Sequence, residues 1–228
     1  MTTPIVALLP MKAHSERVPG KNFRPIAGKP LVRWILDALL EIDAIAKVVI
    51  NTDARELLDE IGVTGSDRIV IRDRKADLCG DMVSMNLILE DDIAATKAGL
   101  YLMTHTTNPL ISTETLRDAI GCFEGNDDAD SLFSVNKIQT RFYRRDGGAV
   151  NHDPGNLVRT QDLEPWFEEN SCLYLFTRDS FAVTGARIGG KPMMYETPPL
   201  ESLEIDEPHQ WFVAEAVLEK RNREMAAK

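Results

Sequence analysis

The chain has 228 residues, of which 43% are hydrophobic and 27% are charged, a composition that excludes wholesale disorder and fibrous repeats. Its 26 Lys and Arg against 36 Asp and Glu leave a net charge of −10, which argues against long polyanionic partners and anionic membrane surfaces. The charge is uneven, because the segment 11–33 holds one acid, Glu16, and the basic residues Lys12, Arg17, Lys21, Arg24, Lys29 and Arg33. A small anionic ligand remains compatible with this pattern.

The cysteines and apolar runs indicate a compartment. Cys79, Cys122 and Cys172 are widely spaced and form no CxxC motif, so we expect reduced thiols and a cytoplasmic protein. The first apolar run, residues 5–9, is too short for the core of a signal peptide. No stretch approaches the roughly 20 apolar residues of a membrane span.

The predicted elements alternate between short buried strands and helices. We expect strands at residues 5–9, 48–50, 69–71, 100–103 and 131–135. Helices are predicted after Pro30, around residues 56–58, and over residues 87–98 and 113–123. This alternation indicates an α/β fold with a mostly parallel sheet. Ligands of such sheets bind beyond the carboxyl ends of the strands, so the loops there are the expected binding region.

The pattern changes in the last third of the chain. Residues 136–170 contain few aliphatic side chains, which fits a loose excursion or an arm that needs a partner to bury its aromatic residues. Strand character resumes at residues 173–176. Residues 203–206 alternate apolar and acidic side chains, which predicts a strand, and residues 208–220 are predicted to form a terminal helix.

The loop after the first strand, residues 10–22, is a candidate phosphate site. It carries Lys12, Arg17 and Lys21, the hydroxyl of Ser15, and Gly20, which permits close approach of the backbone. Cations and backbone N–H groups that converge on one point suit a polyphosphate. The loop has neither the GxxxxGK[ST] nor the GxGxxG pattern. A solvated basic loop is the alternative, but its place after the first strand favours anion binding.

The pair Glu204 and Asp206 is a candidate metal site. On a strand, residues i and i+2 share a face and lie about 6.6–6.8 Å apart. Two carboxylates on one face suit Mg²⁺, which takes its remaining ligands from water and substrate phosphates. The alternative is that Asp206 caps the helix containing Pro208 and that Glu204 is solvated.

A series of motifs carries a family resemblance. The loop with Lys12, Ser15, Arg17 and Pro19–Asn22, followed by residues 28–31, resembles the signature loop of the acylneuraminate cytidylyltransferases, the family of CMP-sialic acid synthetases. Further segments resemble that family's motifs in the same order: residues 51–53, 74–78 with Asp81 and Ser84, 105–110, 159–163, 170–174 and 202–206. The ordered series is far more specific than any single motif.

The resemblance implies a Rossmann-like three-layer sandwich with a mostly parallel central sheet, of the nucleotide-diphospho-sugar transferase type. It implies a single domain over residues 1–228, with residues 136–170 as an inserted arm that forms a homodimer and reaches the partner's sugar site. The implied reaction joins CTP and an acidic 2-keto sugar, sialic acid or a related nonulosonate, into a CMP-sugar and releases pyrophosphate.

The resemblance also implies roles for residues by their motif positions. Lys21, Arg17 and Lys12 would be catalytic, with Lys21 stabilising charge on the phosphorus. Ser15, Asn22, Arg74 and Ser84 would bind the nucleotide, and His105, Asn170, Arg159 and Gln161 the sugar. Glu204 and Asp206 would bind Mg²⁺.

Several positions depart from the family pattern: Lys12 replaces Arg, His14 and Glu16 replace Gly and Lys, His105 replaces Gln, Glu168 replaces Arg, and Glu204 replaces Asp. An acid at position 168 would repel a sugar carboxylate. Two alternatives therefore stand beside the main interpretation. One is a nucleotidyltransferase of the same fold with another NTP or sugar, and the other is a non-catalytic nucleotide- or sugar-binding relative.

Overall fold

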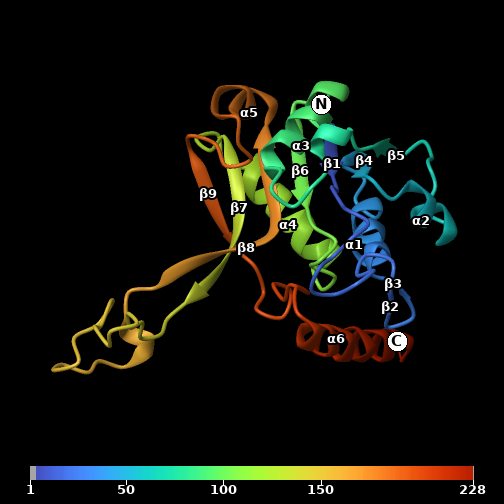
Figure 1. The fold of residues 1–228 in the computed structure, drawn as a ribbon. Coiled ribbons are helices and arrows are strands. Elements are labelled where there is room, and N and C mark those ends of the chain that lie inside the picture. The colour runs from blue at the N-terminus through green and yellow to red at the C-terminus, as the bar shows by residue number, and fades with distance from the viewer. Residues whose placement is uncertain (1–3, 228) are drawn as a thin grey trace.

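One seven-stranded sheet forms the centre of the molecule in the computed structural model, which describes residues 4–227 (Figure 1). The strand order is β5-β4-β1-β6-β8-β7-β9. The strands are β1 (Ile5–Leu8), β4 (Ile45–Thr52), β5 (Ile69–Asp73), β6 (Leu100–Thr104), β7 (Ser131–Ile138), β8 (Trp166–Thr177) and β9 (Pro192–Glu196). Neighbours pair in parallel except at β8, which is antiparallel to both β6 and β7. The prediction of a mostly parallel α/β sheet is confirmed.

Helices cover both faces of this sheet. The helices α1 (Leu31–Leu40), α2 (Arg55–Glu60) and α4 (Thr113–Glu124) contribute to one apolar cluster, and α3 (Met85–Ala95) and α5 (Arg178–Thr184) to another. The short strand β1 supplies both clusters, because successive strand residues point to opposite faces. Ile5 and Ala7 pack in the first cluster, and Val6 and Leu8 pack in the second. The implied three-layer arrangement is thus present.

The last helix, α6 (Pro208–Ala226), lies apart from these two layers (Figure 1). Trp211, Ala214 and Leu218 form its buried stripe, at the spacing expected for one helical face. They pack in a third apolar cluster that includes Leu31 and Ile205. The small hairpin of β2 (Pro25–Ile26) and β3 (Lys29–Pro30) contributes to the same cluster. This packing fixes the acidic segment before α6 next to the basic loop.

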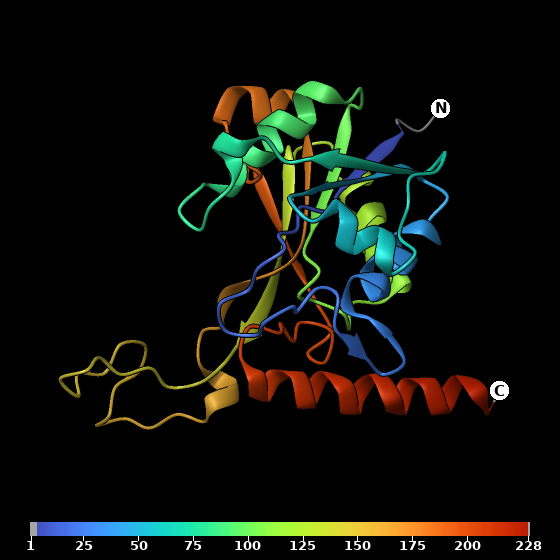
Figure 2. The ribbon, with the colours of Figure 1, turned by 45° about the vertical axis from the view of Figure 1, so that its right-hand side comes forward.

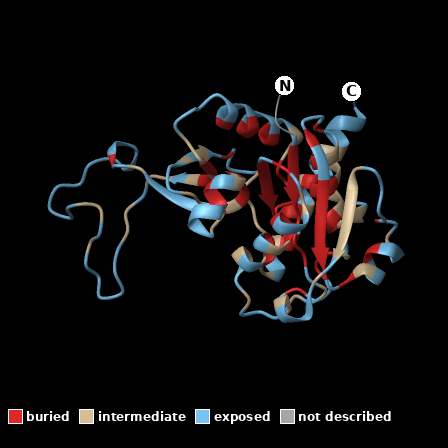
Figure 3. Ribbon diagram, turned by 90° about the horizontal axis from the view of Figure 1, so that it is seen from above, coloured by how far each residue is buried: buried red, intermediate tan, exposed pale blue. Residues whose placement is uncertain are grey.

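The arm is a prominent projection (Figures 1 and 2). Strands β7 and β8 remain paired out to Ile138 and Trp166, and residues 139–165 extend beyond them with one short 3-10 turn, η2 (Thr160–Asp162). Figure 3 shows that most of this projection is exposed. Its exposed apolar side chains include Tyr143, Val150, Leu157 and Val158. Of the predicted arm at residues 136–170, residues 136–138 therefore belong to β7 and residues 166–170 to β8.

Other boundaries also differ from the sequence prediction. The hairpin β2–β3, helix α5 and strand β9 have no counterpart in it, because two- to seven-residue elements carry too little periodicity. Helix α3 ends at Ala95 rather than at residue 98, and α6 continues to Ala226. None of the helices within residues 4–227 combines the length and apolar character needed to cross a membrane.

Candidate active site

A cavity of about 170 Å³ opens where the loops after β1 and β6 meet. Its lining includes the predicted site residues Lys12, Ser15, Lys21, Asn22, Arg74 and His105. These residues come from three separate segments of the chain. The sheet brings them together because β1, β5 and β6 are parallel and their carboxyl ends lie at one edge.

The loop after β1 is held in shape by its own backbone and by Asn22. A turn at Gly20, which has a φ of +65°, lets the Gly20 carbonyl accept from the backbone N–H groups of Phe23 and Arg24 at 3.0 Å. The Asn22 amide donates to the Lys12 carbonyl at 2.9 Å, and its oxygen accepts from the Thr106 hydroxyl at 2.6 Å. Asn22 thus joins the loops after β1 and β6 and sets the shape of the cavity.

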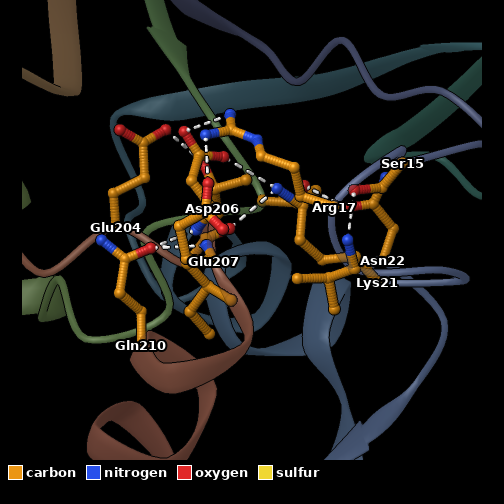
Figure 4. A network of polar contacts seen from close by, with 12 residues as sticks. Ser15, Arg17, Lys21, Asn22, Glu204, Asp206, Glu207 and Gln210 are labelled. Atoms are coloured by element: carbon orange, nitrogen blue, oxygen red, sulfur yellow. Dashed lines mark hydrogen bonds and ion pairs between the residues drawn. The ribbon is translucent and has the colours of Figure 1, made fainter.

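The basic loop and the acidic segment before α6 meet directly (Figure 4). Lys21, only 7% exposed, donates to the Ile205 carbonyl at 2.7 Å and lies 3.0 Å from Asp206 Oδ1. Arg17 lies 3.0 Å from Asp206 Oδ2 and 2.9 Å from Glu207 Oε1. Two features that the sequence separates by about 185 positions therefore form one charged centre.

The acidic segment is not a strand, so the prediction for residues 203–206 is wrong. It crosses the end of the sheet, where the Ile205 N–H donates to the Thr107 carbonyl at 2.8 Å. The apolar and acidic residues still point in different directions, because Ile205 is buried in the third cluster while Glu204 and Asp206 are half-exposed. Thr107 donates to Glu204 Oε1 at 2.9 Å. Burial, together with the nearby Asp206 charge, raises the pKa of Glu204.

Asp206 is not the cap of α6, which removes the structural alternative for this residue. The N-cap is Glu207, in a capping box with Gln210. The Gln210 side-chain oxygen accepts from the backbone N–H groups of Asp206 and Glu207, both at 2.7 Å. The Asp206 carboxylate is consequently left to interact with Lys21 and Arg17.

Arg74 is fixed at the wall of the cavity by three acceptors. It donates to Asn51 Oδ1 at 3.0 Å and to the carbonyls of Met11 and Asn51, both at 2.9 Å. The Asn51 amide in turn donates to Asp92 Oδ1 at 2.8 Å. Sequence reasoning assigns no role to Asp92, since one acid within a helix carries no signal of this contact.

Asp92 gives a testable pH dependence. Its side chain is completely buried, and burial raises its pKa from 3.8 to about 6. Between these values the folded state binds more protons than the unfolded state, so this group's contribution to stability falls as pH rises. We expect the unfolding free energy of wild type relative to Asp92→Asn to drop by about 1 kcal/mol from pH 5 to pH 7.5. Urea denaturation of both proteins at both pH values measures the difference, and a pH-independent difference would contradict it.

Three further predicted residues lie at or next to the cavity, in different settings. Burial, with the nearby charges of Arg187 and Lys21, lowers the pKa of His105 to about 4, so its ring is neutral at pH 7. Ser84 caps α3 by accepting from the Asn86 N–H at 3.3 Å, and it lines a neighbouring cavity rather than this one. Lys12 forms an ion pair with Asp81 at the rim.

The remaining sugar-site predictions are not brought to the cavity within one chain. Asn170 is buried and donates to Asn136 Oδ1 at 2.9 Å and to the Thr197 hydroxyl at 2.6 Å. Arg159 pairs with Asp162 at 2.7 Å on the arm. The carbonyl of Gln161 accepts from Gln139 on the arm. The sugar-binding roles of these residues stay predictions.

A family model described as cytidylyltransferase matches residues 6–225, nearly the whole chain. The chain belongs to the cytidylyltransferase family. It is therefore a nucleotidyltransferase, and the charged centre at the carboxyl edge of the sheet is its candidate active site.

Curated relatives of this cytidylyltransferase carry the names of sugar-acid enzymes. The CMP-N,N'-diacetyllegionaminic acid synthase of Legionella pneumophila is 28% identical, over 94% of this chain and 96% of its own length. The N-acylneuraminate cytidylyltransferase of Oncorhynchus mykiss is also 28% identical, over 92% of this chain but only 49% of its own length. The pseudaminic acid cytidylyltransferase of Campylobacter jejuni is 24% identical over 75% of this chain and 78% of its own length.

Solved structures support the fold. A CMP:2-keto-3-deoxy-manno-octonic acid synthetase in complex with CTP superposes with a TM-score of 0.68 at 15% identity, covering 96% of this chain and 99% of the other. A 4-diphosphocytidyl-2C-methyl-D-erythritol synthase from Anaerococcus prevotii gives a TM-score of 0.67 at 12% identity, covering 95% and 96% of the two chains. The cytidylyltransferase thus shares its overall fold with these proteins.

Proposed function

We propose that this cytidylyltransferase transfers CMP from CTP to the anomeric hydroxyl of an acidic 2-keto sugar, a sialic acid or a related nonulosonate. The observation that carries the proposal is the meeting of Lys21 and Arg17 with Asp206 beside a cavity at the strand ends, two residues along the chain from Glu204. The names of the relatives, which include legionaminic, N-acylneuraminic and pseudaminic acid enzymes, support this acceptor class.

The reaction is a phosphoryl transfer in which the protein mainly positions charge. The anomeric oxygen forms a bond to the α-phosphorus, the bond from that phosphorus to the bridging oxygen of the β-phosphate breaks, and pyrophosphate leaves. The hydroxyl proton passes to solvent. Lys21 and Arg17 would stabilise the negative charge that builds up on the phosphate oxygens, because fixed cations are most effective where water is excluded.

Mg²⁺ is part of this proposal, with Glu204 and Asp206 as its ligands. Within residues 4–227 no three or more His, Cys, Asp or Glu side chains are grouped to hold a metal ion. A pair of carboxylates is nevertheless sufficient for Mg²⁺, which takes its other ligands from water and phosphates. The donors fit, because Glu204 and Asp206 are two partly exposed carboxylates two residues apart, and burial together with the Asp206 charge raises the pKa of Glu204, a cost that a cation would reduce. When bound, the metal would neutralise charge on the phosphates.

The decisive assay measures pyrophosphate release from CTP and Mg²⁺ with a panel of N-acetylneuraminic, legionaminic, pseudaminic and 3-deoxy-manno-octulosonic acids. Release with at least one acid is expected, and its absence with all of them would refute the acceptor class. Thermal stabilisation by CTP rather than ATP, GTP or UTP tests the nucleotide, because a ligand that binds only the folded state raises stability. Binding of CTP without any turnover would favour a non-catalytic relative.

We also propose that the chain forms a homodimer through the arm. An arm of 27 residues that projects from the sheet with Leu157 68% exposed has apolar surface that a second copy would cover. We expect wild type to show about twice its 25.5 kDa chain mass by light scattering. Leu157→Asp should shift the protein towards the single-chain mass, because a charge would be buried in the interface.

The matched control for the dimer is Val183→Asp, a similar change at an exposed apolar residue of α5, away from the arm. It should leave the mass unchanged. Equal masses for wild type and Leu157→Asp would contradict the role of the arm. The cytoplasm is the proposed compartment, which is consistent with three free cysteines in the described chain.

A further inference from the structure

A second cavity, of about 320 Å³, lies beside the candidate active site. Met85, the first residue of α3, lines both cavities, so the two are neighbours across one flexible side chain. The polar residues of the second cavity are Ser84, Asn86, Glu169 and Arg187. A ligand that fills the first cavity and extends past Met85 therefore meets a single cation, Arg187, among the residues lining the second.

Arg187 is held in a fixed orientation between α5 and β9. The guanidinium carbon lies 3.9 Å from the centroid of the Tyr174 ring, a cation–π contact. One terminal nitrogen lies 3.4 Å from Glu169 Oε1, and the Tyr174 hydroxyl donates to that same oxygen. The side chain is only 21% exposed. The planar fork is thus pre-organised in the wall of the second cavity.

The guanidinium keeps donors for a ligand. Throughout residues 4–227, Glu169 Oε1 supplies the one oxygen that accepts from the Arg187 side chain. The other terminal nitrogen faces Met103 Sδ at 3.9 Å, and a thioether is a weak acceptor. The Arg187 charge also contributes to the lowered pKa of His105, which places it within electrostatic reach of the first cavity.

The other cations around the first cavity have closer protein partners than Arg187, which lies 3.4 Å from Glu169. Lys21 and Arg17 bind Asp206, Arg74 donates to three protein oxygens, and Lys12 pairs with Asp81. Under the proposed function, Lys21 and Arg17 bind the triphosphate of CTP. An acidic acceptor carries a carboxylate of its own that needs a different partner.

We propose that Arg187 binds the carboxylate of the acidic acceptor sugar, and that the second cavity is the anion-recognising end of the acceptor site. The assignment rests on the proposed function. A guanidinium fork donates to both oxygens of a carboxylate, which a neutral sugar does not offer. Glu169 and Tyr174 act as positioning residues that hold the fork in place. Arg187 therefore determines specificity for acidic over neutral acceptors.

The test compares wild type with Arg187→Gln and Arg187→Lys, with the best acid of the panel at saturating CTP. We expect Arg187→Gln to raise the KM for the acceptor by about 10- to 100-fold, the range for a lost charge-assisted hydrogen bond. The acceptor KM of Arg187→Lys should lie between those of wild type and Arg187→Gln, because lysine keeps the charge but lacks the planar guanidinium. The KM for CTP should stay unchanged. Lys191→Gln is the matched control, an exposed cation of the following segment that lines neither cavity.

A substrate analogue sharpens the test. The C1 carboxamide of the same acid keeps the sugar and removes the negative charge. Wild type should discriminate strongly against it, whereas Arg187→Gln should use acid and amide almost equally. An unchanged acceptor KM in Arg187→Gln, or undiminished discrimination by that variant, would overturn the assignment while the proposed function stands. If wild type uses no acid of the panel, the proposed function fails and the assignment falls with it.

Discussion

Replacing Lys21 by methionine is expected to lower kcat by about 100- to 1,000-fold, the usual effect of removing one group that stabilises transition-state charge. Lys21 is the most deeply buried cation of the basic loop, and its ammonium group lies between the Ile205 carbonyl and Asp206. Methionine keeps the length and apolar character of the stem, so the loop should retain its packing. Pyrophosphate release at saturating CTP and acceptor gives the kcat.

The matched control for this prediction is Lys29→Met. Lys29 belongs to the same basic stretch, but its ammonium group lies 2.6 Å from Asp37 and 4.1 Å from the Trp34 ring centroid, outside the cavity. Its kcat should stay within about threefold of wild type, as expected for a partly exposed structural ion pair. Equal losses in the two variants would show that overall charge of the stretch, rather than Lys21, supports turnover.

Replacing Asp206 by asparagine should separate nucleotide binding from turnover. In the structure Asp206 neutralises Lys21 and Arg17, the cations that are proposed to bind the triphosphate. Without this competing carboxylate, the variant should bind CTP in the presence of EDTA at least as tightly as wild type. Turnover should nonetheless fall by about 100-fold and require more Mg²⁺, because one of two proposed metal ligands is lost. Calorimetry with EDTA and a Mg²⁺ titration of activity measure the two effects.

Glu207→Gln is the control, because Glu207 also pairs with Arg17 but is not a proposed metal ligand. It should leave the Mg²⁺ requirement unchanged. The raised pKa of Glu204 adds a pH dependence, since a protonated carboxyl does not bind Mg²⁺ and activity should fall as pH drops through that pKa. Loss of both CTP binding and turnover in Asp206→Asn would contradict a metal-ligand role and favour a purely structural one.

Local patterns in the sequence identify most of the helices and the central strands. Strand β1 is covered on both faces and is therefore a continuous apolar run, whereas helix α1 buries one face and shows helical spacing of its apolar residues. The acidic segment shows the limit of this reasoning. Its alternation arises from Ile205 packing against α6 rather than from a sheet, which the sequence alone does not distinguish.

Some candidate site residues can be identified from the sequence and others cannot, for physical reasons. Lys12, Lys21 and Asn22 belong to one short loop whose charge and glycine content are visible in the chain. Arg187 and Asp92 carry no local signal, because their importance comes from Tyr174, Glu169 and Asn51, which lie elsewhere in the sequence. The motif predicts that Ser84 binds the nucleotide; in the structure its hydroxyl caps α3, and the residue lines the second cavity.

Neighbours along the chain are enough to indicate the α/β class, the basic loop and the pair of carboxylates at residues 204 and 206. The contact between the basic loop and the acidic segment depends on packing between distant parts of the chain, because α6 buries Trp211 and Leu218 and thereby places Asp206 against Lys21. The net charge of −10 is thus compatible with a small polyanionic substrate. Tertiary packing brings Lys21 and Asp206 together although they are 185 positions apart in the sequence. Local sequence patterns contain no information about contacts between such distant segments.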